Sequence, residues 1–192
     1  MINFEKAVAD MQHLGFLPPC KPVHIALPDA RNLLFRGLNY YTGGKAVWLP
    51  AYDEVADWLT DNKCRGLFLF GQCGVGKSLI CTRILPVLIN YYQHKVLGVY
   101  DAQQMNANVD LLKSEKLLCI DDVGTENVSV KYGERRYAFS EIADHAEKNA
   151  TLLIVTTNLS LSQLSEKYGE RTADRIIGLT RRVEVRGNSF RY

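Results

Sequence analysis

The stretch GQCGVGKS, residues 71–78, decides the fold predicted for this chain. The apolar run GLFLF at residues 66–70 leads into it, and the helix-like run LICTRIL at residues 79–85 follows it. A strand, a glycine-rich loop and a helix in this order are the setting of a phosphate-binding loop. The glycines let successive backbone N–H groups point into one concavity, and the N-terminus of the following helix adds partial positive charge. The sequence therefore predicts a site for an anion the size of a phosphate.

Two side chains of this loop have expected chemical roles. Lys77 would reach the β- and γ-phosphates of a nucleotide as a point charge, and the Ser78 hydroxyl would be a ligand of Mg²⁺. The alternative, a glycine-rich turn that binds nothing, must also explain the strand before it and the helix after it. The residues expected to contact the bound nucleotide are Gly71, Gln72, Cys73, Gly74, Val75, Gly76, Lys77, Ser78 and Leu79.

Length and composition narrow the class of protein. The 192 residues are enough for one domain with a short extension and a self-sufficient core. The five cysteines are odd in number and form no C-x-x-C motif, which favours a reducing, cytoplasmic setting over a disulfide framework or a zinc ribbon. No apolar run approaches the ~18 residues that span a bilayer, so no membrane partner is expected. A net charge of +2 gives no overall attraction to nucleic acid, and any DNA contact would need a local basic patch.

The first fifty residues are expected to form an N-terminal extension, residues 1–50, ahead of a main domain at residues 51–192. Apolar residues at positions 4, 7, 8, 11 and 14 have helical spacing, and the prolines at 18 and 19 stop the pattern. A short amphipathic helix is therefore predicted, with an apolar side that packs either on its own domain or on a partner. Residues 20–50 carry several prolines and glycines and are expected to be irregular. Within them, Tyr40 and Tyr41 either stack on a base or pack together.

Apolar runs alternate with helical patterns over the rest of the chain. Strands are expected at residues 66–70, 95–100, 117–120, 151–156 and 182–185, and helices at 52–63, 79–85, 102–113, 135–148, after Ser160 and at 173–177. Pro86 is expected to bend or end the helix that follows the loop. Strands without polar alternation are buried on both faces of a mainly parallel sheet. The predicted fold class is α/β, a layered P-loop NTPase fold with a central five-stranded sheet and flanking helices.

The run LLCIDD, residues 117–122, ends a buried strand in two carboxylates, the pattern of a Walker B element. Asp121 is expected to bind Mg²⁺ directly or through water, and Asp122 to orient or deprotonate the attacking water. An Asp-Asp pair alone is a weak signal because such pairs are frequent in turns. Its distance from the glycine loop leaves room for one strand-helix unit, and this spacing makes the assignment specific.

Three further side chains are candidates. Asn158 follows the next buried strand and would hold the lytic water or a γ-phosphate oxygen, or else cap the next helix. Arg171 and Arg175 lie one helical turn apart in the run YGERTADRI. Charges at that spacing commonly form a solvated face. The functional alternative is an arginine finger, which stabilises charge on a transferring phosphoryl group.

The order GQCGVGKS, LLCIDD, TTN, YGERTADRI and a terminal GNSFR resembles the DnaC/IstB-like branch of the AAA+ ATPases, which comprises bacterial helicase loaders and transposition ATP-binding proteins. The resemblance covers residues 52–191. It implies that residues 71–78 are Walker A and that Asp121 and Asp122 are Walker B. It further implies that Asn158 is sensor 1 and that Arg175 is an arginine finger acting on ATP bound by a neighbouring subunit, with Arg171 the second candidate. Arg191 matches the terminal GxSxR feature.

The resemblance implies an ATPase that uses ATP and Mg²⁺, assembles into a homo-oligomeric ring or spiral through Arg175, and acts on a replicative helicase or a transposase. Single-stranded DNA is a further expected partner. However, the segment between the second and third strands, residues 101–116, is short, whereas many members carry a DNA-contacting insertion there. The second acidic residue is Asp122, where many AAA+ proteins have glutamate. A nucleotide-gated binding module with little turnover is therefore one alternative. The other is a small-molecule kinase, against which the chain lacks a separate arginine-rich lid after the third strand.

Overall fold

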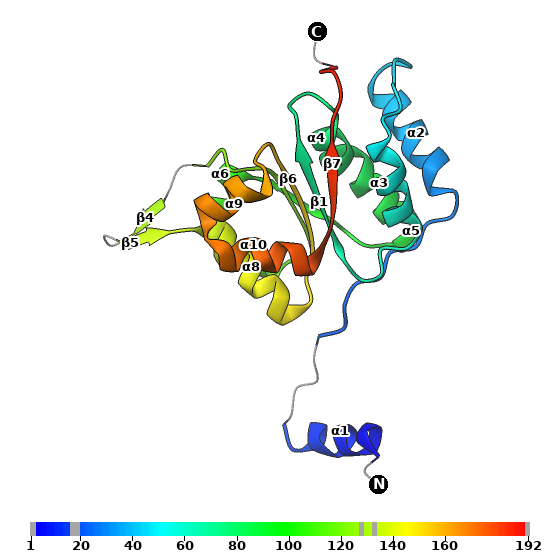
Figure 1. Ribbon diagram of the computed structural model, residues 1–192. Helices are drawn as coiled ribbons and strands as arrows, with labels where there is room; N and C mark the ends of the chain where they lie inside the picture. The colour runs from blue at the N-terminus through cyan, green and yellow to red at the C-terminus, as the bar shows by residue number, and fades with distance from the viewer. Residues whose placement is uncertain (1–2, 16–19, 127–128, 132–133, 191–192) are drawn as a thin grey trace.

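The computed structural model describes residues 3–15, 20–126, 129–131 and 134–190 of the chain. Its centre is a five-stranded sheet in the order β2-β3-β6-β1-β7, with every neighbouring pair parallel (Figure 1). The strands are β1 Gly66–Gly71, β2 Gly98–Asp101, β3 Leu117–Val123, β6 Leu152–Thr157 and β7 Thr180–Val185. The predicted α/β fold with a five-stranded parallel sheet is confirmed.

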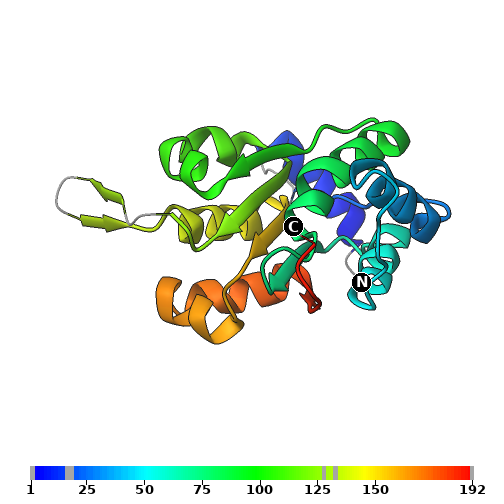
Figure 2. The same ribbon diagram turned by 90° about the horizontal axis from the view of Figure 1, so that it is seen from above.

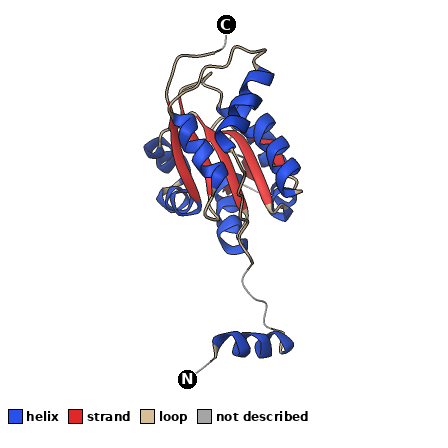
Figure 3. Ribbon diagram, turned by 90° about the vertical axis from the view of Figure 1, so that its right-hand side faces the viewer, coloured by secondary structure: helices blue, strands red, loops and turns tan. Residues whose placement is uncertain are grey.

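Helices cover both faces of this sheet (Figures 2 and 3). Successive residues of a strand point to opposite faces, so Leu67 and Leu69 of β1 join one apolar core and Phe68 joins the other. The first core lies under the helices that flank the glycine loop. The second lies under α8 Ala138–Asn149, α9 Leu161–Tyr168 and α10 Glu170–Leu179. Burial on both faces explains why these strands carry continuous apolar runs.

Residues 20–50 were expected to be irregular, but part of this segment is helical. Helix α2 spans Ala30–Tyr41 and packs against α3 Ala51–Thr60, which leads into β1. Gly37 looks like a helix breaker in the sequence, yet it lies inside α2 at a close approach, where an added Cβ would be 2.7 Å from Cγ2 of Ile84. Leu34 and Leu38 are buried in the same core as α3 and β1. The division of the chain at residue 51 stays a prediction.

The helix after the glycine loop does not end at Pro86. It runs through α4 Lys77–Leu79, a π-helical turn η1 Ile80–Ile84 and α5 Leu85–Gln93. In the wider turn, the backbone N–H of Leu85 donates to the carbonyl of Ile80. An extra residue in one turn is a known way to accommodate a disturbed hydrogen-bond ladder. The helix therefore continues past the proline.

Other elements differ in detail from the sequence expectation. The segment expected as one helix at 102–113 forms two, α6 Ala102–Ala107 and α7 Val109–Ser114. An antiparallel hairpin, β4 Ser129–Lys131 with β5 Glu134–Arg136, precedes α8 and extends away from the sheet (Figure 1). The predicted N-terminal amphipathic helix is confirmed as α1 Phe4–His13, on which Phe4 and Met11 are exposed. No helix in the described part of the chain is long and apolar enough to cross a lipid bilayer.

Candidate nucleotide-binding site

The glycine loop, residues 71–78, connects the end of β1 to the start of α4, as predicted. Gly71, Gly74 and Gly76 have φ values of 121°, 79° and 83°, which side-chain-bearing residues rarely adopt. Space is limiting as well, because a Cβ on Gly71 would lie 2.5 Å from the carbonyl oxygen of Val185. A Cβ on Gly76 would lie 2.7 Å from the Tyr52 hydroxyl. The loop therefore requires glycine at these positions.

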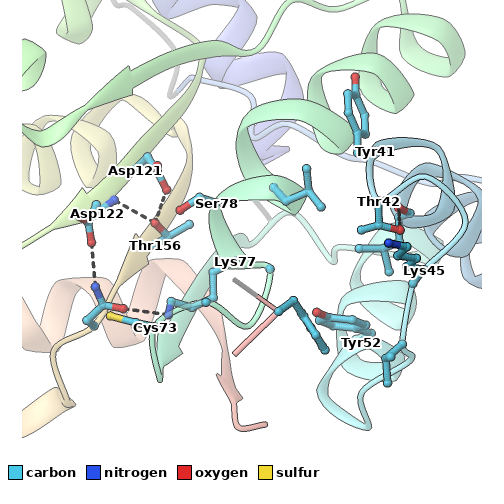
Figure 4. Close-up of a pocket in the computed structure, with 18 residues that line it drawn as sticks. Tyr41, Thr42, Lys45, Tyr52, Cys73, Lys77, Ser78, Asp121, Asp122 and Thr156 are labelled. Carbon is cyan, nitrogen blue, oxygen red and sulfur yellow. Dashed lines mark hydrogen bonds between the residues drawn. The ribbon is translucent and has the colours of Figure 1, made fainter. Parts of the chain in front are cut away.

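A cavity of about 710 Å³ lies over this loop (Figure 4). The expected site residues that line it are Cys73, Gly74, Gly76, Lys77, Ser78, Leu79, Asp121, Asp122 and Asn158. These residues lie at or directly after the carboxyl ends of β1, β3 and β6, and they meet here because the carboxyl ends of parallel strands lie at one edge of the sheet. Gly71, Gln72 and Val75 do not line the cavity, and the Val75 side chain is fully buried. Contacts of these three residues with a nucleotide stay predictions.

Lys77 is almost completely buried within the loop. Its ammonium group donates to the carbonyl oxygens of Gly71 and Gln72, at 2.9 Å and 2.6 Å, and to Oδ1 of Asn158 at 2.9 Å. A buried cation needs such acceptors because desolvation would otherwise be costly. The arrangement holds a positive charge beside the loop's backbone N–H groups, which suits an anionic ligand.

The two aspartates are oriented by Thr156, which sequence reasoning missed as a site residue. The Thr156 hydroxyl donates to Oδ1 of Asp121 at 2.5 Å and accepts the backbone N–H of Asp122 at 2.9 Å. The pairing of β3 with β6 shifts between Ile120 and Val123, and Asp122 has a φ of 57°. This bulge separates the directions of the two carboxylates (Figure 4).

Asn158 connects the glycine loop to the second aspartate. Its side-chain oxygen accepts from Lys77, and its Nδ2 donates to Oδ1 of Asp122 at 2.9 Å. The alternative expectation, that Asn158 caps the next helix, is wrong. Ser160 is the N-cap of α9, the helix expected after it, and forms a capping box with Gln163.

The opposite wall of the cavity comes from the end of α2 and the loop after it. Its residues are Leu38, Tyr41, Thr42, Lys45, Ala46 and Val47. Only Tyr41 was a candidate from the sequence, as one of two alternatives. Tyr52 of α3 completes this side, where its hydroxyl donates to the Val75 carbonyl oxygen at 2.7 Å. An apolar and amphipathic wall opposite a cationic loop is suited to a ligand with a flat ring at one end and charge at the other.

The C-terminal segment crosses the glycine loop. The backbone N–H of Phe190 donates to the Gly74 carbonyl oxygen at 2.9 Å, and Phe190 lines the cavity. Ser189 leaves no room for a side chain at position 74, where a Cβ would be 2.1 Å from its hydroxyl oxygen. Arg191, singled out in the sequence, lies outside the described residues.

Neither candidate arginine lines the cavity. Arg175 is 13% exposed and forms ion pairs with Asp144 and Glu147 of α8, each at 2.7 Å. The hydrogen bond to Glu147 raises the pKa of the Arg175 guanidinium, so it stays charged. Arg171 is 81% exposed, with Asp144 at 3.7 Å. A catalytic role for either arginine would have to be exerted outside this cavity.

The donor set fits Mg²⁺ held partly by a nucleotide. The cavity brings the Ser78 hydroxyl and the Asp121 carboxylate to one side, and Mg²⁺ prefers oxygen ligands of this kind, completed by phosphates and water. In the described part of the chain, no group of three or more His, Cys, Asp or Glu side chains is placed to hold a metal. The Ser78 hydroxyl and the Asp121 carboxylate would therefore supply only part of the ligands of a Mg²⁺ ion.

Comparison with solved structures finds proteins of similar fold. The chain is similar to DnaI (20% identity, TM-score 0.56, covering 85% of this chain and 86% of that one). It is also similar to the DnaC helicase loader (18% identity, TM-score 0.52, 84% and 93% covered). AMPPCP-bound DnaA from Aquifex aeolicus matches over 73% of this chain and 48% of its own length, at 18% identity and a TM-score of 0.51. No protein-family model matches the sequence, and no curated protein sequence does.

The parallel sheet with its strand order, the glycine loop and the paired aspartates define a P-loop NTPase fold of the AAA+ type. Within that class, the fold is similar to those of DnaC and DnaI. The resemblance to DnaC-like AAA+ proteins predicted from the sequence is therefore confirmed at the level of the fold.

Proposed function

We propose that this protein is an AAA+ ATPase that binds and hydrolyses Mg-ATP to load or remodel a partner in DNA replication or in a mobile element. The observation that carries the proposal is the convergence of Lys77, Ser78, Asp121 and Asp122 on one cavity. One similar structure is a helicase loader and another is a DnaA bound to AMPPCP. These neighbours support a replication-related role.

Binding begins at the glycine loop. The backbone N–H groups of the loop and the start of the helix after it would hold the β-phosphate, with the Lys77 ammonium on the β- and γ-phosphates. To do so, Lys77 exchanges at least one of its carbonyl or amide acceptors for phosphate oxygen. The Ser78 hydroxyl and Asp121 would hold Mg²⁺, which supplies charge neutralisation on the phosphates when bound. Tyr41 and Val47 lie on the wall that would face the base.

Hydrolysis requires a water aligned with the γ-phosphate. Asp122 is the candidate to accept its proton, and Asn158 holds that carboxylate through Nδ2. Asp122 is one methylene shorter than glutamate, so its reach to the water is shorter and slow turnover is expected. This feature favours the second candidate function, a nucleotide-gated binding module. Normal ATP affinity without phosphate release, even with DNA and partner added, would select that alternative.

The nucleotide site can be mapped by the reactivity of cysteines that the chain already carries. Cys73 is exposed and lines the cavity, whereas the exposed Cys20 and Cys64 do not. Mg-ATP at ten times its dissociation constant is expected to slow maleimide labelling of Cys73 about tenfold and to leave Cys20 and Cys64 unchanged. Cys81 and Cys119 are buried, and burial raises the pKa of the Cys81 thiol, so both should label slowly throughout. Peptide mass spectrometry reads all five; equal labelling of Cys73 with and without Mg-ATP would contradict the proposed site.

Arg175 is proposed to act on ATP held by a neighbouring subunit of a homo-oligomer. The specific ATPase rate should then rise with protein concentration, and Arg175→Ala should stay at the low rate of the monomer. Mixing Arg175→Ala with Lys77→Ala should restore part of the activity. At some interfaces of the mixed oligomer, the intact arginine of the Lys77→Ala subunit then meets the intact glycine loop of the Arg175→Ala subunit. Glu147→Gln is the matched control, since it weakens the same ion pair but keeps the guanidinium. A rate independent of concentration, and equal in wild type and Arg175→Ala, would exclude the trans role.

The partner and location are also part of the proposal. We place the protein in the cytoplasm because all five cysteines are free thiols. A replicative helicase or a transposase is the proposed partner, and single-stranded DNA is a proposed additional ligand. Capture of candidate partners in ATP and in ADP tests this directly. Retention of a helicase or transposase in one nucleotide state only is the expected result, and equal retention in both states would contradict a nucleotide switch.

A further inference from the structure

Glu126 is a buried carboxylate to which the proposed chemistry assigns no role. It lies in the turn that begins at the second aspartate, here called the aspartate turn (residues 122–126), and is 8% exposed. Its Oε2 accepts the backbone N–H of Gly124 at 2.8 Å, and its Oε1 accepts the hydroxyl of Tyr168. The Lys167 ammonium lies 3.7 Å from Oε1. A charge this buried is retained only where such partners compensate for its desolvation.

Lys167 fixes the backbone of the same turn. Its ammonium donates to the carbonyl oxygen of Gly124 at 2.6 Å and to that of Glu126 at 3.3 Å. Lys167 and Tyr168 are consecutive residues at the C-terminal end of α9. Burial raises the pKa of Tyr168, which keeps its hydroxyl protonated as a donor to Glu126. The end of α9 is therefore attached to the aspartate turn by two side chains.

The aspartate turn has little freedom of its own. The carbonyl oxygen of Asp122 accepts the hydroxyl of Thr125 at 2.9 Å. Gly124 has a φ of 107°, and a Cβ there would lie 2.6 Å from Cδ1 of Leu159. A displacement of Asp122 would consequently be passed to Glu126 rather than absorbed between them.

The end of α9 leads directly to the arginine-bearing helix. Gly169, with a φ of 88°, separates α9 from α10, and Arg171 lies in the first turn of α10. The hydroxyl of Thr172 donates to the carbonyl oxygen of Tyr168 at 3.0 Å, which ties the two helices across this corner. Contacts between α9 and α10 are extensive. The path from Asp122 to the first turn of α10 thus runs through hydrogen-bonded and packed groups at every step.

We propose that Glu126, Lys167 and Tyr168 are positioning residues that couple the aspartate turn to α10, so that nucleotide bound beside Asp121 and Asp122 sets the position of Arg171 and Arg175. The inference rests on the proposed ATP site and adds the route by which its occupancy reaches the surface that carries the arginines. Thr156 holds the Asp121 carboxylate and the backbone N–H of Asp122 in one arrangement. A ligand that contacts both aspartates would favour one arrangement of them over others. Loss of the Glu126 link leaves the cavity residues in place but separates them from α10.

Hydrogen-deuterium exchange on the full chain tests this coupling. In the wild type, Mg-ATP is expected to slow exchange both at residues 71–78 and at residues 161–179. In Glu126→Gln, the loop should be protected as in the wild type, while the response of residues 161–179 falls by about half or more. Tyr168→Phe removes the same hydrogen bond from the other side and should reproduce the result. Asp61→Asn, which removes an exposed carboxylate of the His24 pair before β1, is the matched control and should respond as the wild type does.

Kinetics separate coupling from simple loss of structure. Glu126→Gln is expected to keep its KM for ATP within about twofold and to lose about fivefold or more in kcat in the assembled protein. Unfolding temperatures of all variants are measured alongside. An unchanged response of residues 161–179 in both variants, or no response there in the wild type, overturns the coupling. Absence of protection at residues 71–78 in the wild type overturns the proposed ATP site instead.

Discussion

The Lys77→Ala variant is expected to bind Mg-ATP about 100-fold more weakly than the wild type. Lys77 supplies the cation of the glycine loop, and two charge-assisted contacts to phosphate oxygens amount to about 3 kcal/mol, since each tenfold change in affinity is about 1.4 kcal/mol. Isothermal titration calorimetry with Mg-ATP measures the change. An affinity within about threefold of the wild type would show that Lys77 does not contact the phosphates.

Two controls make this result specific. Lys148→Ala removes a lysine that is 66% exposed and paired with Asp144 on α8, and it should leave Mg-ATP affinity unchanged. Lys77 is itself buried and donates to three oxygen atoms, so its loss is also expected to lower the unfolding temperature. Titrations are therefore run well below the unfolding temperature of the variant, and circular dichroism confirms that it is folded.

The Asp122→Asn variant is expected to lose about 100-fold or more in kcat, because a positioned general base contributes roughly 10² to 10⁴. Asparagine has nearly the same shape, and its side-chain oxygen can still accept from Nδ2 of Asn158. Mg-ATP affinity should therefore stay within about threefold of the wild type, since the change removes proton acceptance and not phosphate contacts. Steady-state phosphate release and calorimetry together give the two quantities.

Asp122→Glu tests the same role in the opposite direction. The added methylene extends the carboxylate toward the water. If the distance between the Asp122 carboxylate and the water limits turnover, kcat should rise. An unchanged kcat in Asp122→Asn would show that this carboxylate does not act on the water. A wild-type protein with normal affinity and no turnover would instead support the nucleotide-gated binding module.

The central part of the site could be predicted because its chemistry is local in sequence. The glycines, Lys77 and Ser78 are contiguous, and the flanking apolar runs fix which elements enter and leave the loop. Asp121 and Asp122 follow a buried run, and parallel strands place such ends at one edge. Contiguous spacing and burial were therefore sufficient to predict the fold and the convergence of these residues.

Other parts depend on contacts between segments that are distant in sequence. Thr156 contacts the two aspartates because the register between β3 and β6 is shifted. The spacing of residues along a single strand does not predict such a shift. The wall formed by Thr42 and Val47 exists because α2 packs on η1 through Gly37, and that glycine resembles a helix breaker in the sequence. The ion pairs of Arg175 with α8 likewise follow from the packing of α8 and α10.

The central claim is that the glycine loop and the two aspartates hold one metal-bound triphosphate at a single edge of the sheet. Its most direct test is calorimetric titration of the wild type and of Asp121→Asn with ATP, in Mg²⁺ and again in EDTA. The account predicts a single site in the wild type that binds ATP about tenfold or more tightly with Mg²⁺, and loss of that gain in Asp121→Asn. No heat of binding in Mg²⁺, or an equal gain from Mg²⁺ in both proteins, would contradict it.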